Sequence, residues 1–233
     1  MTINSEFVVC GPQTSKPSLS RPVMIVGLLA LLVLGSATLW FVFRAAWADA
    51  ITLSARSIVA EWREGSGPAF TPELWDRTRG QLQSALNAVP GNARLHDDLG
   101  FLHAARSQGM GDVPIDGPEH LLQQTLMEAA IDHYREASAL RPTFPYSLTY
   151  LALAKHLREQ HDEEFWSAFD HAMQYGQTEA ALQSPLAEIG FANWSRLGVK
   201  RQKAVVDMVA NAKAPLRKKL TAMADQAGIV LRR

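Results

Sequence analysis

One uncharged stretch near the N-terminus constrains this chain more than any other feature. Residues 22–43 (PVMIVGLLALLVLGSATLWFVF) contain no charged side chain over 22 positions. At about 1.5 Å of rise per residue, a helix of this length crosses a hydrocarbon core of about 30 Å. Arg21 and Arg44 flank the stretch, and Trp40 and Trp47 lie near its later end, where indole rings favour the membrane interface. We therefore predict a transmembrane helix over residues 22–43.

A cleaved signal peptide is the competing interpretation of the same stretch. The apolar region of a signal peptide is usually about 7–15 residues long and precedes a small-x-small cleavage site. Here the apolar region is longer and begins only after a polar tail of 21 residues, although AWADA at residues 46–50 resembles a cleavage site. The length of the apolar region favours a permanent anchor.

Charge constrains the orientation of this predicted helix only weakly. Lys16 and Arg21 precede the apolar stretch, whereas Arg44, Arg56 and Arg63 follow it. Basic residues mark the cytoplasmic side of a membrane helix, so this near-even count leans slightly against export of the C-terminal part. A short N-terminal tail followed by a single span is nevertheless typical of a signal anchor. On that ground we expect the large C-terminal domain outside the cytoplasm.

The chain divides into four predicted segments. Residues 1–21 are expected to form a disordered tail before the membrane helix at residues 22–43. Residues 44–64 are expected to continue that helix into water as a stalk, which GSGP at residues 65–68 ends. Residues 65–233 are expected to form a helical domain. Apolar residues at helical spacing support the stalk: Trp47, Ile51, Ile58 and Trp62.

The C-terminal domain has little of the alternating pattern of β-strands. Thr71 is a predicted N-cap and Pro72 a predicted first helical residue. Pro145, Pro185 and Pro215 each suit the first turn of a helix, where the missing N–H has no helical partner to lose. A Gly/Pro-rich loop is expected at residues 107–120, and helices are expected at residues 72–89, 94–106, 121–140, 145–159, 163–175, 185–197, 199–212 and 215–227.

A spaced pattern recurs along these helices. It consists of a large apolar residue, a small residue three positions later and a proline five positions after that, as at Tyr134, Ala137 and Pro142. It recurs 52 residues earlier and, with glutamine in place of proline, 35 residues later, at Leu82, Ala85 and Pro90 and at Phe169, Ala172 and Gln177. The shorter spacing is close to the tetratricopeptide helix–turn–helix unit of about 34 residues. Residues 72–176 thus resemble tetratricopeptide repeats, and we predict a repeat solenoid rather than an unrelated helical bundle.

The resemblance implies a concave binding surface lined by the first helix of each pair. Six residues are the resulting candidates for contact with a partner protein: Arg94, Asp97, Phe101, Tyr146, Tyr150 and Lys155. Core packing is the alternative role for the aromatic residues, and a solvated surface is the alternative for the charged ones. Gly100 is expected to allow close contact between paired helices.

The sequence carries no motif for catalysis, a cofactor or a metal. HExxH, GxSxG, Walker A and GxGxxG are absent, and the single cysteine, Cys10, excludes an intramolecular disulfide. No two of the seven histidines are four residues apart, so we interpret them as surface or packing residues. The acidic pairs Asp97-Asp98 and Glu163-Glu164 are expected to face solvent. We therefore predict a non-enzymatic protein without catalytic, cofactor-binding or metal residues.

Charge is distributed unevenly although the formal net charge is zero. Residues 200–233 contain nine Lys/Arg and two acidic residues, whereas residues 65–199 contain nine Lys/Arg and seventeen acidic residues. The basic C-terminal helices are either a solvated cap of the domain or a contact for anionic lipid or an anionic polymer. Aromatic residues do not alternate with these cations, so a nucleic-acid partner is not expected.

Three segments carry a closer family resemblance. YREASALRPTFPYSLTYLALAK, FDHAMQYG and IGFANWSRL resemble the VpsP-like proteins of bacterial exopolysaccharide biosynthesis over about 65 residues. The residues that carry it are Ala137, Leu140, Arg141, Pro142, Pro145, Tyr146, Lys155, Gly190, Trp194 and Leu197. The resemblance implies a single-pass, non-enzymatic protein of the bacterial inner membrane. Its repeat domain would face the periplasm and help to assemble a polysaccharide synthesis or export complex.

Two alternative functions stay open from the sequence. One is an assembly chaperone for another envelope system, such as cytochrome maturation. The other is a subunit that binds polysaccharide directly through the face that carries Tyr146 and Lys155.

Overall fold

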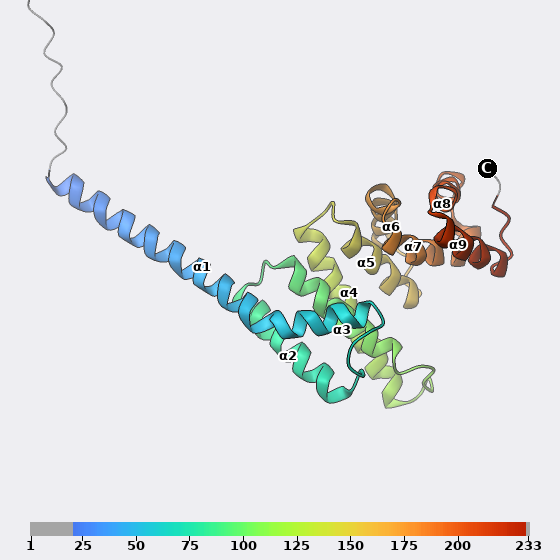
Figure 1. Cartoon of the computed structure of the whole chain (residues 1–233), viewed down its shortest axis with the longest axis horizontal. Helices are drawn as coiled ribbons and strands as arrows, with labels where there is room; N and C mark the ends of the chain where they lie inside the picture. The colour runs from blue at the N-terminus through green and yellow to red at the C-terminus, as the bar shows by residue number, and fades with distance from the viewer. Residues whose placement is uncertain (1–20, 232–233) are drawn as a thin grey trace, which may run out of the picture. The chain divides into compact units, whose positions relative to one another are not determined.

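The structure is a computed structural model that describes residues 21–231. Within that range it contains nine α-helices, one short 3-10 helix and no β-strand (Figure 1), which confirms the all-helical prediction. The predicted disordered tail, apart from Arg21, lies outside the described residues, and so does Cys10. The chain separates into two compact units, the first ending at Arg44 and the second beginning at Ala45.

The N-terminal helix α1 (Arg21–Arg63) is 43 residues long. Its apolar part exposes large side chains on all sides, including Leu31 at 69% and Phe41 at 68%. A helix with apolar residues around its whole circumference and no protein packed against it suits a lipid environment. The helix is therefore long enough and apolar enough to span a membrane.

The later part of α1 belongs to the helical domain and does not stand free as the predicted stalk. Ala48, Thr52, Ala55 and Val59 recur at intervals of four, three and four residues and are at most 2% exposed. The apolar members of this face share a core cluster with residues of α2 and α3. Trp47, one of the apolar residues whose spacing predicted the helical stalk, is 57% exposed. The buried face of this segment consists of small side chains, which bring the neighbouring helices close.

Eight helices follow α1, and most begin at a residue that the sequence marks. Thr71 accepts a hydrogen bond from the Leu74 N–H, and Asn92 and Asp162 cap their helices in the same way. The helices are α2 (Pro72–Ala88), α3 (Ala93–Gln108), α4 (Pro118–Leu140), α5 (Pro145–Leu157), α6 (Glu163–Gly176), α7 (Ala180–Ala192), α8 (Val199–Asn211) and α9 (Ala214–Gln226), with the 3-10 helix Trp194–Arg196 before α8.

The start of α7 differs from the prediction. Pro185 lies inside the helix and not in its first turn, because the helix already begins at Ala180. The missing N–H of Pro185 would have bonded the carbonyl of Ala181, so only one hydrogen bond near the helix start is lost. Leu182 is completely buried, and this burial favours a helix that starts before the proline.

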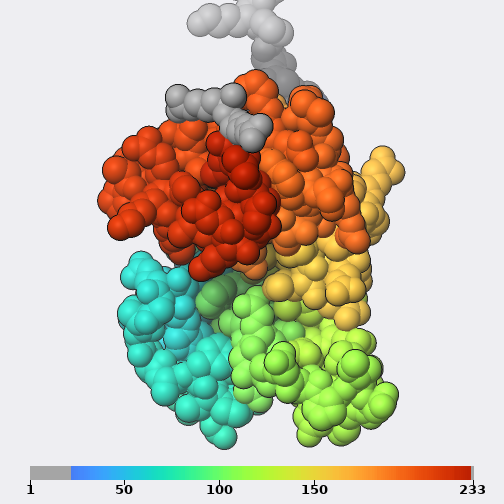
Figure 2. All heavy atoms as spheres, turned by 90° about the vertical axis from the view of Figure 1, so that its right-hand side faces the viewer, coloured from blue at the N-terminus to red at the C-terminus, as the bar shows by residue number. Residues whose placement is uncertain are grey.

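The helices of the domain pack in chain order (Figure 2). Each helix from α2 to α9 contacts the next, and α7 also contacts both α5 and α9. Where α3 crosses α4, a Cβ atom on Gly100 would lie 2.8 Å from the ring of Tyr134, so only glycine permits this approach. The recurring pattern found in the sequence is a packing pattern, since its paired residues are at most 2% exposed: Leu82 and Ala85, Tyr134 and Ala137, and Phe169 and Ala172.

Candidate functional site

A pocket of about 340 Å³ lies between the end of α1, the first half of α3 and the junction of α4 with α5. Four of the six sequence-predicted binding residues line it, namely Arg94, Asp97, Tyr146 and Tyr150. The other lining residues are Arg63, Asp98, Arg141 and Phe144. The pocket therefore combines guanidinium groups, carboxylates and aromatic rings from α1, α3, α5 and the connection between α4 and α5.

Asp97 is the polar centre of the pocket floor. Its carboxylate accepts a hydrogen bond of 2.7 Å from the Ser147 hydroxyl and forms a salt bridge with Arg141. Its backbone carbonyl accepts a further bond of 2.9 Å from Arg63. These contacts join α1, α3, the end of α4 and α5 through a single residue, so the pocket has a fixed floor.

Asp98, the residue after Asp97 in α3, anchors α1 through its side chain. Its side chain is 4% exposed and lies 2.9 Å from the guanidinium of Arg63 and 4.0 Å from that of Arg56. Burial raises the pKa of both Asp97 and Asp98, and the adjacent arginines oppose that rise. The prediction that this acidic pair faces solvent is wrong, because both residues are at most 9% exposed.

Positive charge exceeds negative charge around the pocket. Arg63, Arg94 and Arg141 line it, whereas only Asp97 and Asp98 carry negative charge there. Arg94 forms no salt bridge with any residue that the structure describes. Arg94 acts on Asp98 only through its charge, without direct contact, so an anionic group in the pocket could form an ion pair with its guanidinium.

Aromatic rings form the opposite wall. The guanidinium of Arg141 lies 4.0 Å from the centroid of the Phe144 ring, and Phe144 stacks on Tyr146 at 5.2 Å. Tyr150 stacks on the buried Tyr134 at 5.8 Å. Burial raises the pKa of the Tyr150 hydroxyl, which keeps it protonated and able to donate a hydrogen bond.

The two remaining predicted residues lie outside this pocket. Phe101 lies under the guanidinium of Arg63 at 5.0 Å and lines a neighbouring pocket of about 170 Å³. Lys155 is 2% exposed, and its amine lies 2.7 Å from Asp162 and 2.5 Å from Glu164. Lys155 therefore holds α5 to the start of α6 and presents no free charge to a partner.

Reasoning from sequence missed Arg63, Asp98, Arg141 and Phe144 as pocket residues. Arg141 was named only among the residues that carry the family resemblance, and no binding role was predicted for it. Arg63 is 34 residues from Asp97 in the chain, and its place in the pocket depends on the docking of α1. The RPTFPY segment was a usable signal, because three of its six residues, Arg141, Phe144 and Tyr146, line the pocket.

Three histidines form a separate cluster where α3 meets α4. The Nδ1 atoms of His96 and His133 lie 3.1 Å apart, and His103 stacks on His133 at 5.6 Å. Burial, together with the neighbouring histidine, lowers the pKa of His103 and of His133 to about 4. Among the residues that the structure describes, no three His, Cys, Asp or Glu side chains are arranged to hold a metal ion. His103 and His133 are therefore neutral, packed imidazoles at neutral pH.

No protein-family model and no curated protein sequence matches this chain.

Proposed function

We propose that this chain is a membrane-anchored, non-enzymatic scaffold protein that holds a partner protein against its helical domain. One observation carries the proposal, namely the pocket in which three arginines face two aspartates beside a wall of aromatic rings. Arginine and tyrosine are among the residues that most often dominate the binding energy of protein interfaces. The excess of positive charge favours an acidic segment of the partner.

A tetratricopeptide-like solenoid is part of this proposal. Its support is that some helices contact the next helix but one in the chain. Helix α5 contacts α7, and α7 contacts α9, although α6 and α8 lie between them in the sequence. The equivalent buried positions on α2, α4 and α6 give further support. In such an arrangement the odd-numbered helices share one face, and α1, α3 and α5 supply most of the pocket residues.

The biological setting of the proposal is exopolysaccharide synthesis or export at the bacterial inner membrane. Its support is the sequence resemblance, whose residues include Arg141 and Tyr146 in the pocket. The partners would be membrane or periplasmic proteins of the polysaccharide synthesis complex, and the helical domain would lie in the periplasm. The basic helices α8 and α9 remain a predicted contact for anionic lipid or polymer.

Co-purification of the full chain from detergent tests the proposal. Polysaccharide-synthesis membrane proteins are expected to be recovered with the wild-type protein and lost with Arg94→Glu or Tyr146→Ala. Arg94 forms no salt bridge within the described residues. Tyr146 packs against the hydrophobic core and stacks on Phe144, so circular dichroism is used to verify that Tyr146→Ala folds. Arg77→Glu, on an exposed position of α2 that does not line the pocket, is the matched charge control.

The two alternative functions give different results in the same experiment. Recovery of haem-handling proteins alone would support an assembly chaperone for cytochrome maturation and contradict the proposal. Binding of purified full-length protein to acidic polysaccharide, with loss of binding in Tyr146→Ala, would support direct polysaccharide binding. The aromatic rings of the pocket support this second alternative, and so does the guanidinium of Arg94, which forms no salt bridge within the described residues.

A further inference from the structure

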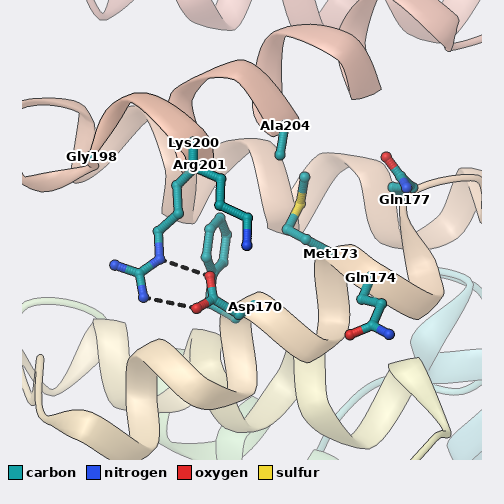
Figure 3. A pocket seen from close by; sticks show the side chains of 9 residues that line it. Asp170, Met173, Gln174, Gln177, Gly198, Lys200, Arg201 and Ala204 are labelled. Carbon is teal, nitrogen blue, oxygen red and sulfur yellow. Dashed lines mark hydrogen bonds and ion pairs between the residues drawn. The ribbon is translucent and has the colours of Figure 1, made fainter.

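A second pocket, of about 650 Å³, lies between α6 and α8, and it shares no lining residue with the first (Figure 3). Small-molecule sites in proteins are typically concave, about 300–1,000 Å³ in volume, and mostly apolar with a few polar groups. The residues that line this pocket are Phe169, Asp170, Met173, Gln174, Gln177, Gly198, Lys200, Arg201 and Ala204. Its size and its lining are therefore those of a small-molecule site.

The floor of the pocket is apolar. Phe169 is completely buried and Met173 is 6% exposed. Figure 3 shows Ala204 on α8 pointing toward Met173 on α6. The small side chain of Ala204 leaves space above Met173 that a larger residue would fill. Apolar carbon atoms placed there would lose contact with water, which is favourable at roughly 25 cal/mol per Å².

The charges at one end of the pocket leave a single unpaired cation. Arg201 and Asp170 neutralise each other through two hydrogen bonds of 2.7 and 2.8 Å. Arg201 is further held over the ring of Trp166 at 4.6 Å. Lys200 forms no ion pair with any residue that the structure describes, and Figure 3 shows it extending from α8 across the pocket toward α6.

The other end of the pocket is neutral. Gln174 and Gln177 supply its polar groups, and the backbone carbonyl of Gln177 is already occupied by a hydrogen bond of 2.7 Å from Gln183. The pocket thus presents one ammonium group, then an apolar floor, then uncharged amides. A complementary ligand has one negative charge at one end and an apolar body.

We propose that this pocket binds a small carboxylic acid with an apolar body, of the class of medium-chain fatty acids. The carboxylate pairs with the ammonium of Lys200, and the apolar body lies beside Met173 and Ala204, above the buried Phe169. A peptide segment is a less complementary occupant, because two neutral amides offer few partners for its backbone. The inference is independent of the proposed scaffold function, since it uses other residues and other helices.

Titration of the full chain in lipid nanodiscs with octanoate tests this site. Methionine methyl groups labelled with ¹³C give a local signal, because Met173 lies in the pocket while Met208 and Met223 lie elsewhere in the domain. Met24, in the apolar part of α1, reports insertion of octanoate into the bilayer. Saturable movement of the Met173 signal, with the other three unchanged, is the expected result.

Two ligand controls and two protein variants separate this site from general hydrophobic binding. Octylammonium and octanol have the same apolar body without the negative charge, and they are expected to bind about two- to fivefold more weakly, because they lack the ion pair with the solvent-exposed Lys200. Lys200→Gln is expected to remove that preference. Lys203→Gln, which removes an exposed lysine paired with Asp207 on the same helix, is expected to preserve it.

Ala204→Phe should abolish octanoate binding by filling the pocket while retaining Lys200. Equal binding of octanoate and octylammonium would overturn the proposal, and so would octanoate binding that is unchanged in Lys200→Gln. Failure of octanoate to move the Met173 signal at saturating concentration would also overturn it. None of these results affects the co-purification test of the scaffold function, so the two proposals fail separately.

Discussion

Arg63 on α1 and Asp98 on α3 form a salt bridge with 2.9 Å between Nη1 and Oδ1. The carboxylate is buried to 4% exposure, whereas the guanidinium is 35% exposed and reaches the pocket. This pair fastens the last turn of the N-terminal helix to the domain. It also places the charge of Arg63 where a ligand can meet it, so anchoring and binding depend on the same side chain.

Removing the carboxylate of this pair is expected to destabilise the domain. Asp98→Ala leaves the partly buried Arg63 and Arg56 without their shared partner, and breaking such a pair costs on the order of 2–3 kcal/mol after allowance for the exposure of Arg63. Urea unfolding followed by circular dichroism measures the change. Asp76→Ala removes a 63% exposed carboxylate of a surface pair on α2 and should change stability by less than about 0.5 kcal/mol. Equal effects of the two variants would contradict the buried role of Asp98.

The domain is expected to lose stability in mild acid through its histidine cluster. The folded-state pKa values of His103 and His133 are about 4, below the ordinary value of 6.5, so the unfolded chain binds more protons as the pH falls. The stabilisation is complete above pH 6.5 and is lost progressively as the pH falls toward 4. Between pH 7 and pH 5 the loss is on the order of 2 kcal/mol for each of the two histidines.

Unfolding experiments at several pH values measure this dependence. The groups around the two imidazoles are His96 on α3, Asp132 on α4 and Arg79 on α2. His133→Gln is expected to flatten the decline in stability between pH 7 and pH 5. His171→Gln, on α6 and outside the cluster, is expected to leave the decline intact. A decline that persists unchanged in His133→Gln would show that other groups control it.

Close packing at Gly100 gives a third prediction. A Cβ atom there would lie 2.8–3.0 Å from three atoms of the Tyr134 ring, and that ring is 2% exposed and has no space to move into. Gly100→Ala should therefore lower the free energy of unfolding by about 1–3 kcal/mol. Gly80→Ala is the matched control, because no atom lies within 4 Å of its Cβ and the residue is inside α2. That variant should be stabilising by about 0.4–1 kcal/mol, so the two alanines are expected to have opposite signs.

Docking of the later part of α1 gives a fourth prediction. Ala55 is completely buried, whereas Leu53, two residues earlier, is 67% exposed. Ala55→Leu should force the helix away from the domain, at a cost of about 1–3 kcal/mol, and should speed proteolysis and amide hydrogen exchange in residues 52–63. Leu53→Ala is expected to leave both unchanged. Rapid amide exchange of residues 52–63 in the wild-type protein would contradict the packing of this segment against α2 and α3.

Most of the helices could be predicted because their ends are marked by local chemistry. Thr71 and Asp162 accept hydrogen bonds from the first N–H groups of their helices, and Pro72 and Pro145 occupy first turns. The expectation that a proline marks the first turn of a helix was wrong at Pro185. There, burial of Leu182 outweighs the loss of one hydrogen bond inside the helix. A tertiary contact decided the position of that helix start, and no local signal reports such a contact.

The candidate pocket could be predicted only in part. Asp97, Tyr146 and Tyr150 follow from the repeat spacing, because that spacing places them on facing helices. The buried face of α1 could not be predicted from the sequence. Its residues Ala48 and Ala55 are small, whereas the large apolar residue Trp47 is exposed. Without that docking, nothing in the chain indicates that Arg63 belongs beside Asp97.

Arg141 has three structural roles, one through its backbone and two through its guanidinium. Its backbone N–H closes α4 on Ala137, its guanidinium covers Phe144, and it neutralises Asp97. Such a residue resists evolutionary change, because any replacement that alters ligand preference also disturbs the joint between two helices. The side chain of Arg94 forms no salt bridge or cation–π contact among the described residues, although it lines the pocket. Divergence of binding specificity in descendants of this chain should therefore begin at position 94, with position 141 held constant.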